Sequence, residues 1–189
     1  MSWVFLTGKT VYKLKKPVRF PYLDFSTLER REGACRAELE LNRRLAYSTY
    51  LDVVPLRASS EGLSFSKGKI VDWLVVMRQL DSVLTLESLI LTRSIDVMQL
   101  DRLGRILGDF YHRAKRIYIS PASHIADWDH SLSANDRILL DPKFALPAGV
   151  VSRIHGAQRR FLADCPHYLT ERVRQRQIVD SHGDLRPEH

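Results

Sequence analysis

The sequence predicts an α+β protein with two lobes. Segments with β-favouring side chains come first, up to about residue 78, and segments with helical periodicity follow. The chain has 189 residues, 44% of them hydrophobic and 27% charged, which is the profile of a globular protein with about one domain. We place the lobe boundary at residue 80, which gives an N-terminal lobe of residues 1–80 and a partial, mainly helical lobe of residues 81–189.

The N-terminal lobe is predicted to contain two β-hairpins and one helix. Residues 3–6 and 10–18 flank the turn signal Gly8-Lys9, which predicts the first hairpin. In its second strand, alternation places Val11, Lys13 and Lys15 on one face. The remaining elements of this lobe follow from leucine spacing and from β-favouring runs: a helix over 26–45, and strands over 52–57 and 69–78 with a loose tip between them.

The second lobe is predicted to be helical. Apolar residues at helical spacing predict helices over 84–91 and 97–115, and a last helix over 150–162. Residues 119–147 contain three prolines and many Ser, Asp and Asn residues, which favours a loop with short helical pieces.

Charge and hydropathy restrict the partners and the location. The formal net charge of +7 suits an anionic partner. The longest run of large apolar residues, 73–77, is far shorter than the roughly 20 residues of a membrane-spanning helix. Cys35 and Cys165 form no close motif, and the N-terminus lacks the pattern of a secretory signal, so we expect a cytoplasmic protein without a membrane partner.

Two apparent motifs are set aside. Gly8-Lys9-Thr10 ends like a Walker phosphate loop, but that pattern requires a glycine at position 3, where this chain has Trp3. A polar cluster in the second lobe fits neither a zinc helix nor a calcium loop, and we interpret it as a solvated loop; its members are His124, Asp127, Asp129 and His130.

The most informative segment lies near the end of the chain. Ile178 and Val179 lead into His182-Gly183-Asp184-Leu185, a sequence suited to a strand that ends in a turn, where Gly183 lets the backbone bend and Asp184 projects at the tip. An ordinary loop with a capping aspartate would account for the tripeptide equally well if it stood alone.

The segment resembles the catalytic loop of the aminoglycoside phosphotransferase and choline kinase group, a branch of the protein-kinase-like fold with the signature His-Gly-Asp-x-x-x-x-Asn. The strings at 2–8, 12–18 and 23–31 are similar to a largely uncharacterised bacterial branch of this group. The resemblance spans the chain, and 118–176 matches only loosely. It implies a small antiparallel β lobe with one helix, followed by a helical lobe.

The resemblance implies roles for the catalytic loop. Asp184 would be the catalytic base that accepts the proton of the substrate hydroxyl, and His182 would brace the loop. The asparagine position, a metal ligand in the family, falls on His189. Histidine in place of asparagine departs from the general pattern, and magnesium prefers oxygen ligands to the nitrogen ligands of histidine. This branch of the family can nevertheless carry histidine at that position.

The resemblance also implies a nucleotide site. A strand lysine would hold the α- and β-phosphates, oriented by a glutamate of the following helix. Lys13 and Lys15 are both candidates, and Lys13 is preferred because Val11 lies two positions before it, under the adenine. For the glutamate, Glu38 is preferred over Glu40. Backbone groups at the hinge would bind adenine, at Met77, Arg78 and Gln79.

The implied activity is transfer of the γ-phosphoryl group of ATP, with Mg²⁺, to a hydroxyl of a small-molecule acceptor. Members of the branch often carry a downstream P-loop domain. The family's acidic metal ligand would follow His189 and a further strand would precede Ser2, so we expect this chain to be a fragment, truncated at both ends and poorly active alone.

The alternative is a degenerate kinase fold that binds a nucleotide without catalysis, or a basic nucleic-acid-binding protein. Residues 153–176 hold six arginines and 9–19 hold five basic residues with no acid. No helix-turn-helix, zinc-finger or aromatic RNA-binding signature accompanies them, so we favour a nucleotide as the anionic partner.

Overall fold

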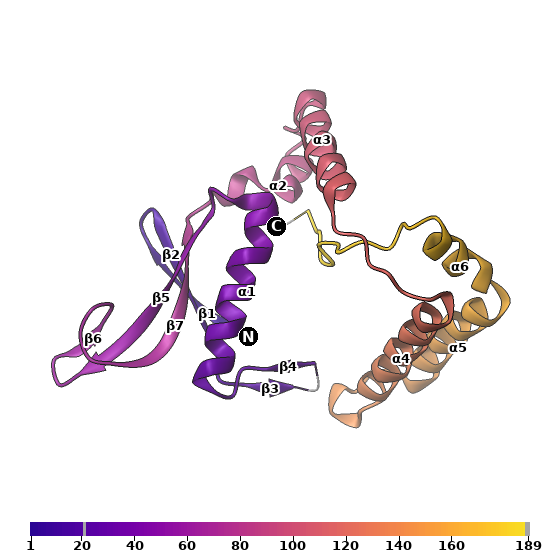
Figure 1. Ribbon diagram of the computed structural model, residues 1–189, viewed down its shortest axis with the longest axis horizontal. Coiled ribbons are helices and arrows are strands. Elements are labelled where there is room, and N and C mark those ends of the chain that lie inside the picture. The colour runs from indigo at the N-terminus through magenta and orange to yellow at the C-terminus, as the bar shows by residue number, and fades with distance from the viewer. Residues whose placement is uncertain (21, 188–189) are drawn as a thin grey trace. The chain divides into compact units, whose positions relative to one another are not determined.

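The computed structural model describes residues 1–20 and 22–187 and is an α+β structure (Figure 1). The chain divides into two compact units. The first contains Met1–Phe110 together with residues 182–187, and the second contains Tyr111–Ser181. Each unit is described by itself below.

The first unit is built on a five-stranded antiparallel sheet in the order β1-β2-β7-β5-β6. Its strands are β1 (Ser2–Thr7), β2 (Thr10–Lys15), β5 (Tyr50–Ser59), β6 (Gly62–Ser64) and β7 (Lys69–Arg78). The pairing of both predicted hairpins is confirmed, because β1 pairs with β2 and β5 pairs with β7. The loose tip predicted for the second hairpin is wrong, because it contains β6, which pairs with β5. Gly8 has φ of +76°, a turn conformation that glycine adopts without steric cost, so Gly8-Lys9-Thr10 forms a hairpin turn.

One helix covers a face of this sheet. Helix α1 (Leu28–Ala46) begins at the N-cap Thr27, whose side chain accepts a hydrogen bond from the backbone N–H of Arg30. Its apolar side packs on β5 and β7, and Cys35 is fully buried there with Val53 and Val75. The helix predicted over 26–45 is therefore confirmed. Because Cys35 is buried against the sheet, the rotation of α1 about its own axis is set, and this determines which of its side chains face the sheet.

A short two-stranded ribbon precedes α1. Its strands, β3 (Arg19–Phe20) and β4 (Leu23–Asp24), pair antiparallel. The Asp24 carboxylate forms ion pairs with Arg19 and Arg30, which tie the ribbon to the first turns of α1. Sequence analysis did not predict this ribbon, because two residues per strand are too few for an alternating pattern.

Helical structure begins soon after β7. A 3-10 turn (Ser82–Leu84) and α2 (Leu86–Leu91) are followed by α3 (Val97–Arg113). The helices predicted over 84–91 and 97–115 are thus confirmed in type and position. The strands end at Arg78, close to the lobe boundary predicted at residue 80. The compact units are divided after Phe110 and after Ser181, and the lobe division at residue 80 stays a prediction.

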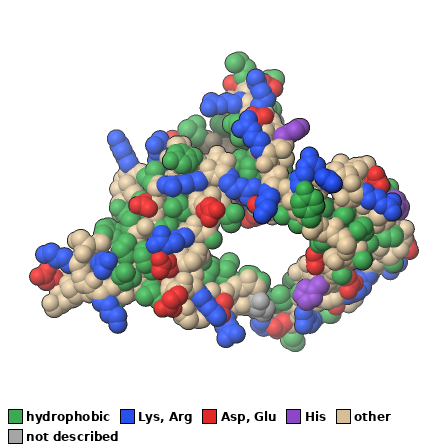
Figure 2. Space-filling view, in the orientation of Figure 1, with side chains coloured by type: hydrophobic (Ala, Val, Ile, Leu, Met, Phe, Trp, Pro, Cys, Tyr) green, Lys and Arg blue, Asp and Glu red, His purple; other side chains and the backbone are tan. Residues whose placement is uncertain are grey.

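The second unit contains three helices: α4 (Pro121–Leu139), α5 (Ala148–Asp164) and α6 (Pro166–Arg174). A 3-10 turn (Pro142–Phe144) lies between α4 and α5. Green hydrophobic side chains reach the surface among basic ones in Figure 2, and in this unit Trp128 and Phe161 are about half exposed.

The loop predicted over 119–147 is wrong, because most of it is α4. Ser120 caps the helix by accepting a hydrogen bond from the N–H of Ser123, and Pro121 occupies the first turn, where a missing N–H costs nothing. Among the serines and aspartates that suggested a loop, Ser131 is exposed, whereas Asp129 and Ser133 bind Arg159 of α5 and Asp136 pairs with His155 of the same helix; Leu132 is buried. Helix α6, which follows Cys165, was not predicted either.

Two segments of the second unit run antiparallel beside each other. Arg116 and Val179 form an isolated β-bridge, and the N–H of Ile117 donates to the carbonyl oxygen of Ile178 at 2.9 Å. The apolar pair before the His-Gly-Asp segment thus takes part in an isolated β-bridge rather than in the strand that the sequence predicts. None of the helices in the described ranges 1–20 and 22–187 is both long and apolar enough to span a membrane.

Candidate functional site

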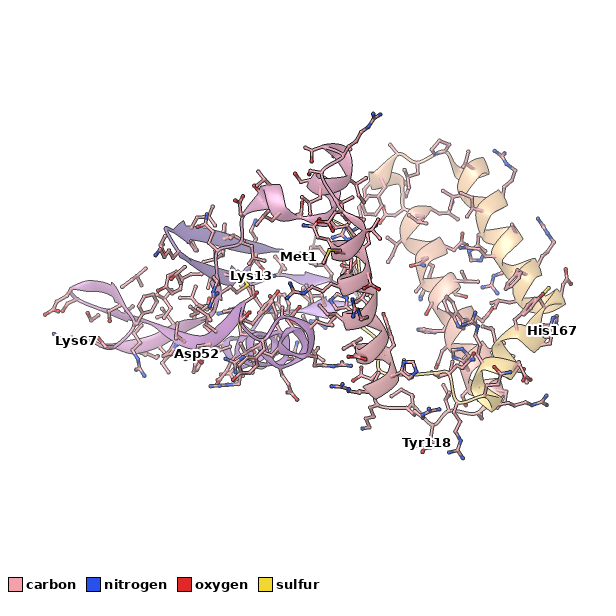
Figure 3. The ribbon with its side chains drawn as sticks, turned by 90° about the horizontal axis from the view of Figure 1, so that it is seen from above. Met1, Lys13, Asp52, Lys67, Tyr118 and His167 are labelled. Carbon is pink, nitrogen blue, oxygen red and sulfur yellow. The ribbon has the colours of Figure 1, made fainter. Side chains whose placement is uncertain are left out.

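The centre of the candidate site is one carboxylate shared by two lysines. The Nζ atom of Lys13 lies 2.8 Å from Oε1 of Glu38, and the Nζ atom of Lys15 lies 2.6 Å from Oε2 of the same residue. Lys13 and Lys15 are two positions apart on β2, so both side chains point to one face of the sheet, and α1 brings Glu38 over that face. Figure 3 labels Lys13 in the sheet.

The two lysines differ in exposure. The Lys15 side chain is only 7% exposed, and its ammonium lies 4.9 Å from the centre of the Phe25 ring. The Lys13 side chain is 31% exposed, so it can meet a solute from the solvent. The structure therefore brings both candidate lysines to the preferred glutamate, with one lysine enclosed and one accessible. Glu40, the other candidate, is exposed on α1.

The lysines also keep Glu38 ionised. Burial alone would raise the pKa of this carboxyl, but the hydrogen bonds and positive charges of Lys13 and Lys15 outweigh burial and hold the pKa below its usual value. With both lysines protonated, the three side chains carry a net charge of +1. An unbalanced positive charge at a partly open site favours binding of an anion beside Lys13.

Val11 and Met77 lie next to this cluster. Val11 is 7% exposed and pairs directly with Met77 across β2 and β7. The hinge residues follow: the N–H of Arg78 donates to the carbonyl of Thr49 at 2.8 Å, and the N–H of Gln79 donates to the carbonyl of Lys9 at 2.9 Å. These two N–H groups hold the chain at the end of β7, and adenine binding at the hinge stays a prediction.

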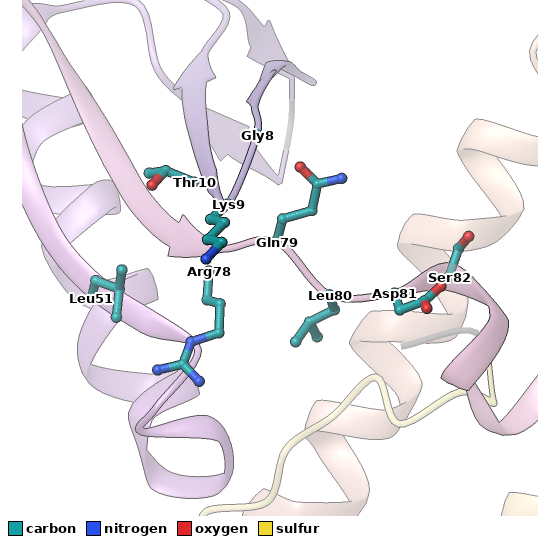
Figure 4. Close-up of a pocket in the computed structure, with 9 residues that line it drawn as sticks. All are labelled: Gly8, Lys9, Thr10, Leu51, Arg78, Gln79, Leu80, Asp81 and Ser82. Carbon is teal, nitrogen blue, oxygen red and sulfur yellow. The ribbon is translucent and has the colours of Figure 1, made fainter.

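A pocket of about 780 Å³ opens at this end of the sheet (Figure 4). It is formed by the turn between β1 and β2, the start of β5, and the connection from β7 to the 3-10 turn. Its lining residues are Gly8, Lys9, Thr10, Leu51, Arg78, Gln79, Leu80, Asp81 and Ser82. Its volume lies in the range of about 300–1,000 Å³ that is typical of small-molecule sites.

The His-Gly-Asp segment forms an open turn in the first unit. Gly183 has φ of +82°, as expected for a glycine that bends the backbone, and Nδ1 of His182 accepts a hydrogen bond from the N–H of Asp184 at 3.3 Å. The role of His182 in bracing the catalytic loop stays a prediction. The Asp184 side chain is 68% exposed and lies 3.3 Å from the guanidinium of Arg186.

The segment after Asp184 is tied to α2. The carbonyl oxygen of Pro187 accepts a hydrogen bond from the backbone N–H of Glu87 at 2.9 Å, and both residues belong to the first unit. His189, the candidate metal ligand, lies outside the described residues.

Sequence analysis did not single out several residues around Glu38. The Asn42 side chain donates a hydrogen bond to the backbone carbonyl oxygen of Glu38 at 2.8 Å. Burial, together with the charge of Glu38, raises the pKa of Tyr50. Beside this cluster, buried Arg31 binds Asp72 at 2.8 Å and the carbonyl of Phe25 at 3.0 Å. Arg31 and Asp72 are 41 positions apart, and no local pattern signals such a pair.

The described residues hold no gathered metal-ligand set. Among residues 1–20 and 22–187, no group of three or more His, Cys, Asp or Glu side chains is placed to hold a metal ion. The cluster around His124 lies on α4 rather than in a loop, with His124 packed edge-on against Trp128.

Comparison with known proteins gives relatives without an established role. The chain is 32% identical over 187 residues to an uncharacterized protein of Mycobacterium tuberculosis and, to the same extent, to one of Mycobacterium bovis. The alignment covers 96% of this chain but 36% of each relative, so the chain spans about a third of the length of these curated relatives. No family model matches the chain, and no solved structure matches it.

Proposed function

We propose that this chain is part of an ATP-dependent phosphotransferase of the protein-kinase-like fold, related to the aminoglycoside phosphotransferase and choline kinase group. The observation that carries the proposal is the pairing of a strand lysine, Lys13, with a glutamate, Glu38, from helix α1, which packs on the sheet. In kinases the same pairing orients the lysine that binds the α- and β-phosphates. The accessible, positively charged side of the cluster supports a phosphate ligand there.

The order of the parts along the chain also supports the proposal. A β-hairpin carries the lysine, the helix carries the glutamate, the last strand leads to a pocket, and the His-Gly-Asp turn comes after the helices. Val11 and Met77 would contact the adenine, and Arg78 and Gln79 would flank it at the hinge. The pocket beside these residues supports that placement.

The proposed reaction transfers the γ-phosphoryl group to a hydroxyl of a small-molecule acceptor. The hydroxyl oxygen forms a bond to the γ-phosphorus as the bond between this phosphorus and the bridging oxygen breaks, releasing ADP. The hydroxyl proton passes to the carboxylate of Asp184 and then to solvent. Its exposure leaves Asp184 open to an acceptor, and His182 would keep the turn in shape.

The described residues form no group of three or more side chains that would hold the magnesium that such a reaction uses. The exposed Asp184 carboxylate is paired with Arg186 and belongs to no group of three or more His, Cys, Asp or Glu side chains within the described part of the chain. We therefore assign no step to the metal here. His189 remains the candidate ligand by resemblance only.

Binding of MgATP tests the proposal. Isothermal titration of the protein with MgATP should give saturable binding that weakens in Lys13→Met. Lys67→Met is a matched control, because it removes the same charge from the exposed tip beside β6 (Figure 3). Absence of binding by the unmodified protein, or equal weakening in both variants, would contradict the proposal.

Asp184→Asn tests the catalytic role. In a form of the protein that transfers phosphate, the substitution should lower turnover by about 10²- to 10⁴-fold, the typical contribution of a positioned general base, while binding of MgATP stays unchanged. Phosphate transfer is followed with γ-labelled ATP and pooled small-molecule acceptors. Unchanged turnover would remove Asp184 from the mechanism.

The alternative is a degenerate kinase-fold protein that binds a nucleotide without catalysis. Binding of MgATP without phosphate transfer would favour it, and steeply salt-dependent binding of nucleic acid without nucleotide binding would favour a basic nucleic-acid-binding module. The proposal includes a cytoplasmic location, supported by the free thiols of Cys35 and Cys165, and a P-loop domain elsewhere in the whole protein.

A further inference from the structure

Two ammonium groups and one carboxylate form an unbalanced cluster at the proposed phosphate site. Lys13 and Lys15 both contact Glu38, at 2.8 and 2.6 Å, and no other carboxylate of the described residues lies within ion-pair distance of either lysine. The nearby carboxylate of Asp72 is bound to Arg31 at 2.8 Å. One carboxylate cannot neutralise two ammonium groups, so one positive charge remains.

The solvent exposure of the two lysines decides which of them carries the unneutralised positive charge. The Lys15 ammonium has little contact with solvent, and a desolvated charge depends on a close counter-ion. The Lys13 ammonium keeps part of its hydration, so it depends less on Glu38. The shorter contact, 2.6 Å, is also the one to Lys15.

We infer that Lys15 is a positioning residue that neutralises Glu38 and holds it in place, so that Lys13 presents an undiminished positive charge to a ligand phosphate. In a simple lysine–glutamate pair the glutamate orients the lysine but also cancels its charge. Here a second, buried lysine removes that cancellation. The inference rests on the proposed function for the identity of the ligand.

The groups that face Glu38 allow this reading. Lys13 and Lys15 approach from β2, the Tyr50 hydroxyl belongs to β5, and Asn42 contacts the backbone of Glu38 from its own helix. The Cys35 thiol is also nearby, and burial raises its pKa to about 11, so it stays neutral at ordinary pH. The charge of the cluster is therefore set by the two lysines and Glu38.

Net charge predicts the order of the variants. Lys15→Met gives a neutral cluster, whereas the double variant Lys15→Met, Glu38→Gln has a charge of +1 again. Lys15→Arg keeps the charge of the original protein. Lys16→Met is the matched control, because Lys16 is the adjacent residue and its ammonium lies 5.2 Å from the centre of the Trp3 ring rather than at Glu38.

The first experiment measures binding of MgATP and of inorganic tripolyphosphate by isothermal titration, after circular dichroism has shown that each variant is folded. Lys15→Met should weaken both ligands by about tenfold, the scale of one charge at short range. Lys15→Arg should recover most of the affinity, and Lys16→Met should lose little. The double variant should bind both ligands more tightly than Lys15→Met, although it lacks the carboxylate that orients Lys13. A merely structural lysine would not be compensated by Glu38→Gln, so a double variant that binds no more tightly than Lys15→Met overturns the inference.

The second experiment needs no ligand and separates this inference from the proposed function. The pKa of the Glu38 carboxyl is measured by carbon NMR in the unmodified protein and in the variants Lys15→Met, Lys15→Arg and Lys16→Met. It should rise in Lys15→Met and stay unchanged in Lys16→Met. If the unmodified protein binds neither MgATP nor tripolyphosphate, the proposed function fails, while the NMR titration still decides the role of Lys15. An unchanged pKa in Lys15→Met overturns that role.

Discussion

Glu38→Ala should be strongly destabilising, because it leaves an enclosed ammonium without a counter-ion. Each charge-assisted hydrogen bond contributes about 1.5–3 kcal/mol. We assign the full energy to the bond with Lys15, because that side chain is only 7% exposed. The bond with Lys13 contributes less, because that side chain is 31% exposed and solvent screens the interaction. The sum is about 2–4 kcal/mol, which overlaps the cost of about 3–5 kcal/mol for breaking a buried ion pair.

Glu40→Ala is the control for this prediction. Glu40 lies two positions further along α1 and is exposed, so its loss should change the free energy of unfolding by less than about 0.5 kcal/mol. Urea unfolding followed by far-ultraviolet circular dichroism compares the two variants. The midpoint should fall by roughly 1 M or more for Glu38→Ala and hardly at all for Glu40→Ala. Equal losses would refute the assignment of Glu38 as the shared counter-ion.

The pH dependence of stability gives a second test of the ionic role of Glu38. The pKa of Glu38 is lower in the folded protein, so its contribution to stability is present above the unfolded value of about 4.3 and is lost as the pH falls through the folded value. Glu38→Gln, which keeps the shape of the side chain, should be less stable than the unmodified protein at pH 7. The difference should begin to shrink near the unfolded value of about 4.3 and disappear as the pH falls through the lower, folded value, and a difference that does not shrink in acid would contradict the ionic origin.

Two further predictions concern burial and backbone space. Cys35 is fully buried and its thiol pKa is raised to about 11, so a thiol reagent should label Cys165 first and Cys35 only on unfolding; equal labelling at pH 7 would be inconsistent with the packing of α1. Gly68→Ala should lower the melting temperature, because Gly68 has φ of +98° and an added Cβ would lie 2.2 Å from the carbonyl oxygen of Ala58. Gly104→Ala in α3 should raise the melting temperature slightly, because an added Cβ has no atom within 4 Å outside the backbone of its own helix. A higher melting temperature for Gly68→Ala than for Gly104→Ala would contradict the geometry.

Much of the first unit could be predicted because its signals are local. Alternating side chains on β2 predicted that Lys13 and Lys15 share a face, and leucine spacing predicted α1. The prediction failed for α4, whose many polar residues are also typical of a loop. The capping Ser120 and the proline in the first turn are signals of a helix start, but the loop prediction gave more weight to the serines and aspartates.

The residue pattern by itself determined that strands precede helices and that the two lysines share one face of a strand, and the family resemblance made Glu38 the preferred of two candidate glutamates. Only the tertiary structure decided how these charges are divided. Burial is a property of packing, and packing encloses Lys15 beside Phe25 while it leaves Lys13 partly open. Because the cost of an uncompensated charge depends on its access to water, the enclosed Lys15 depends most on Glu38, and the partly exposed Lys13 is the lysine that we propose for anion binding.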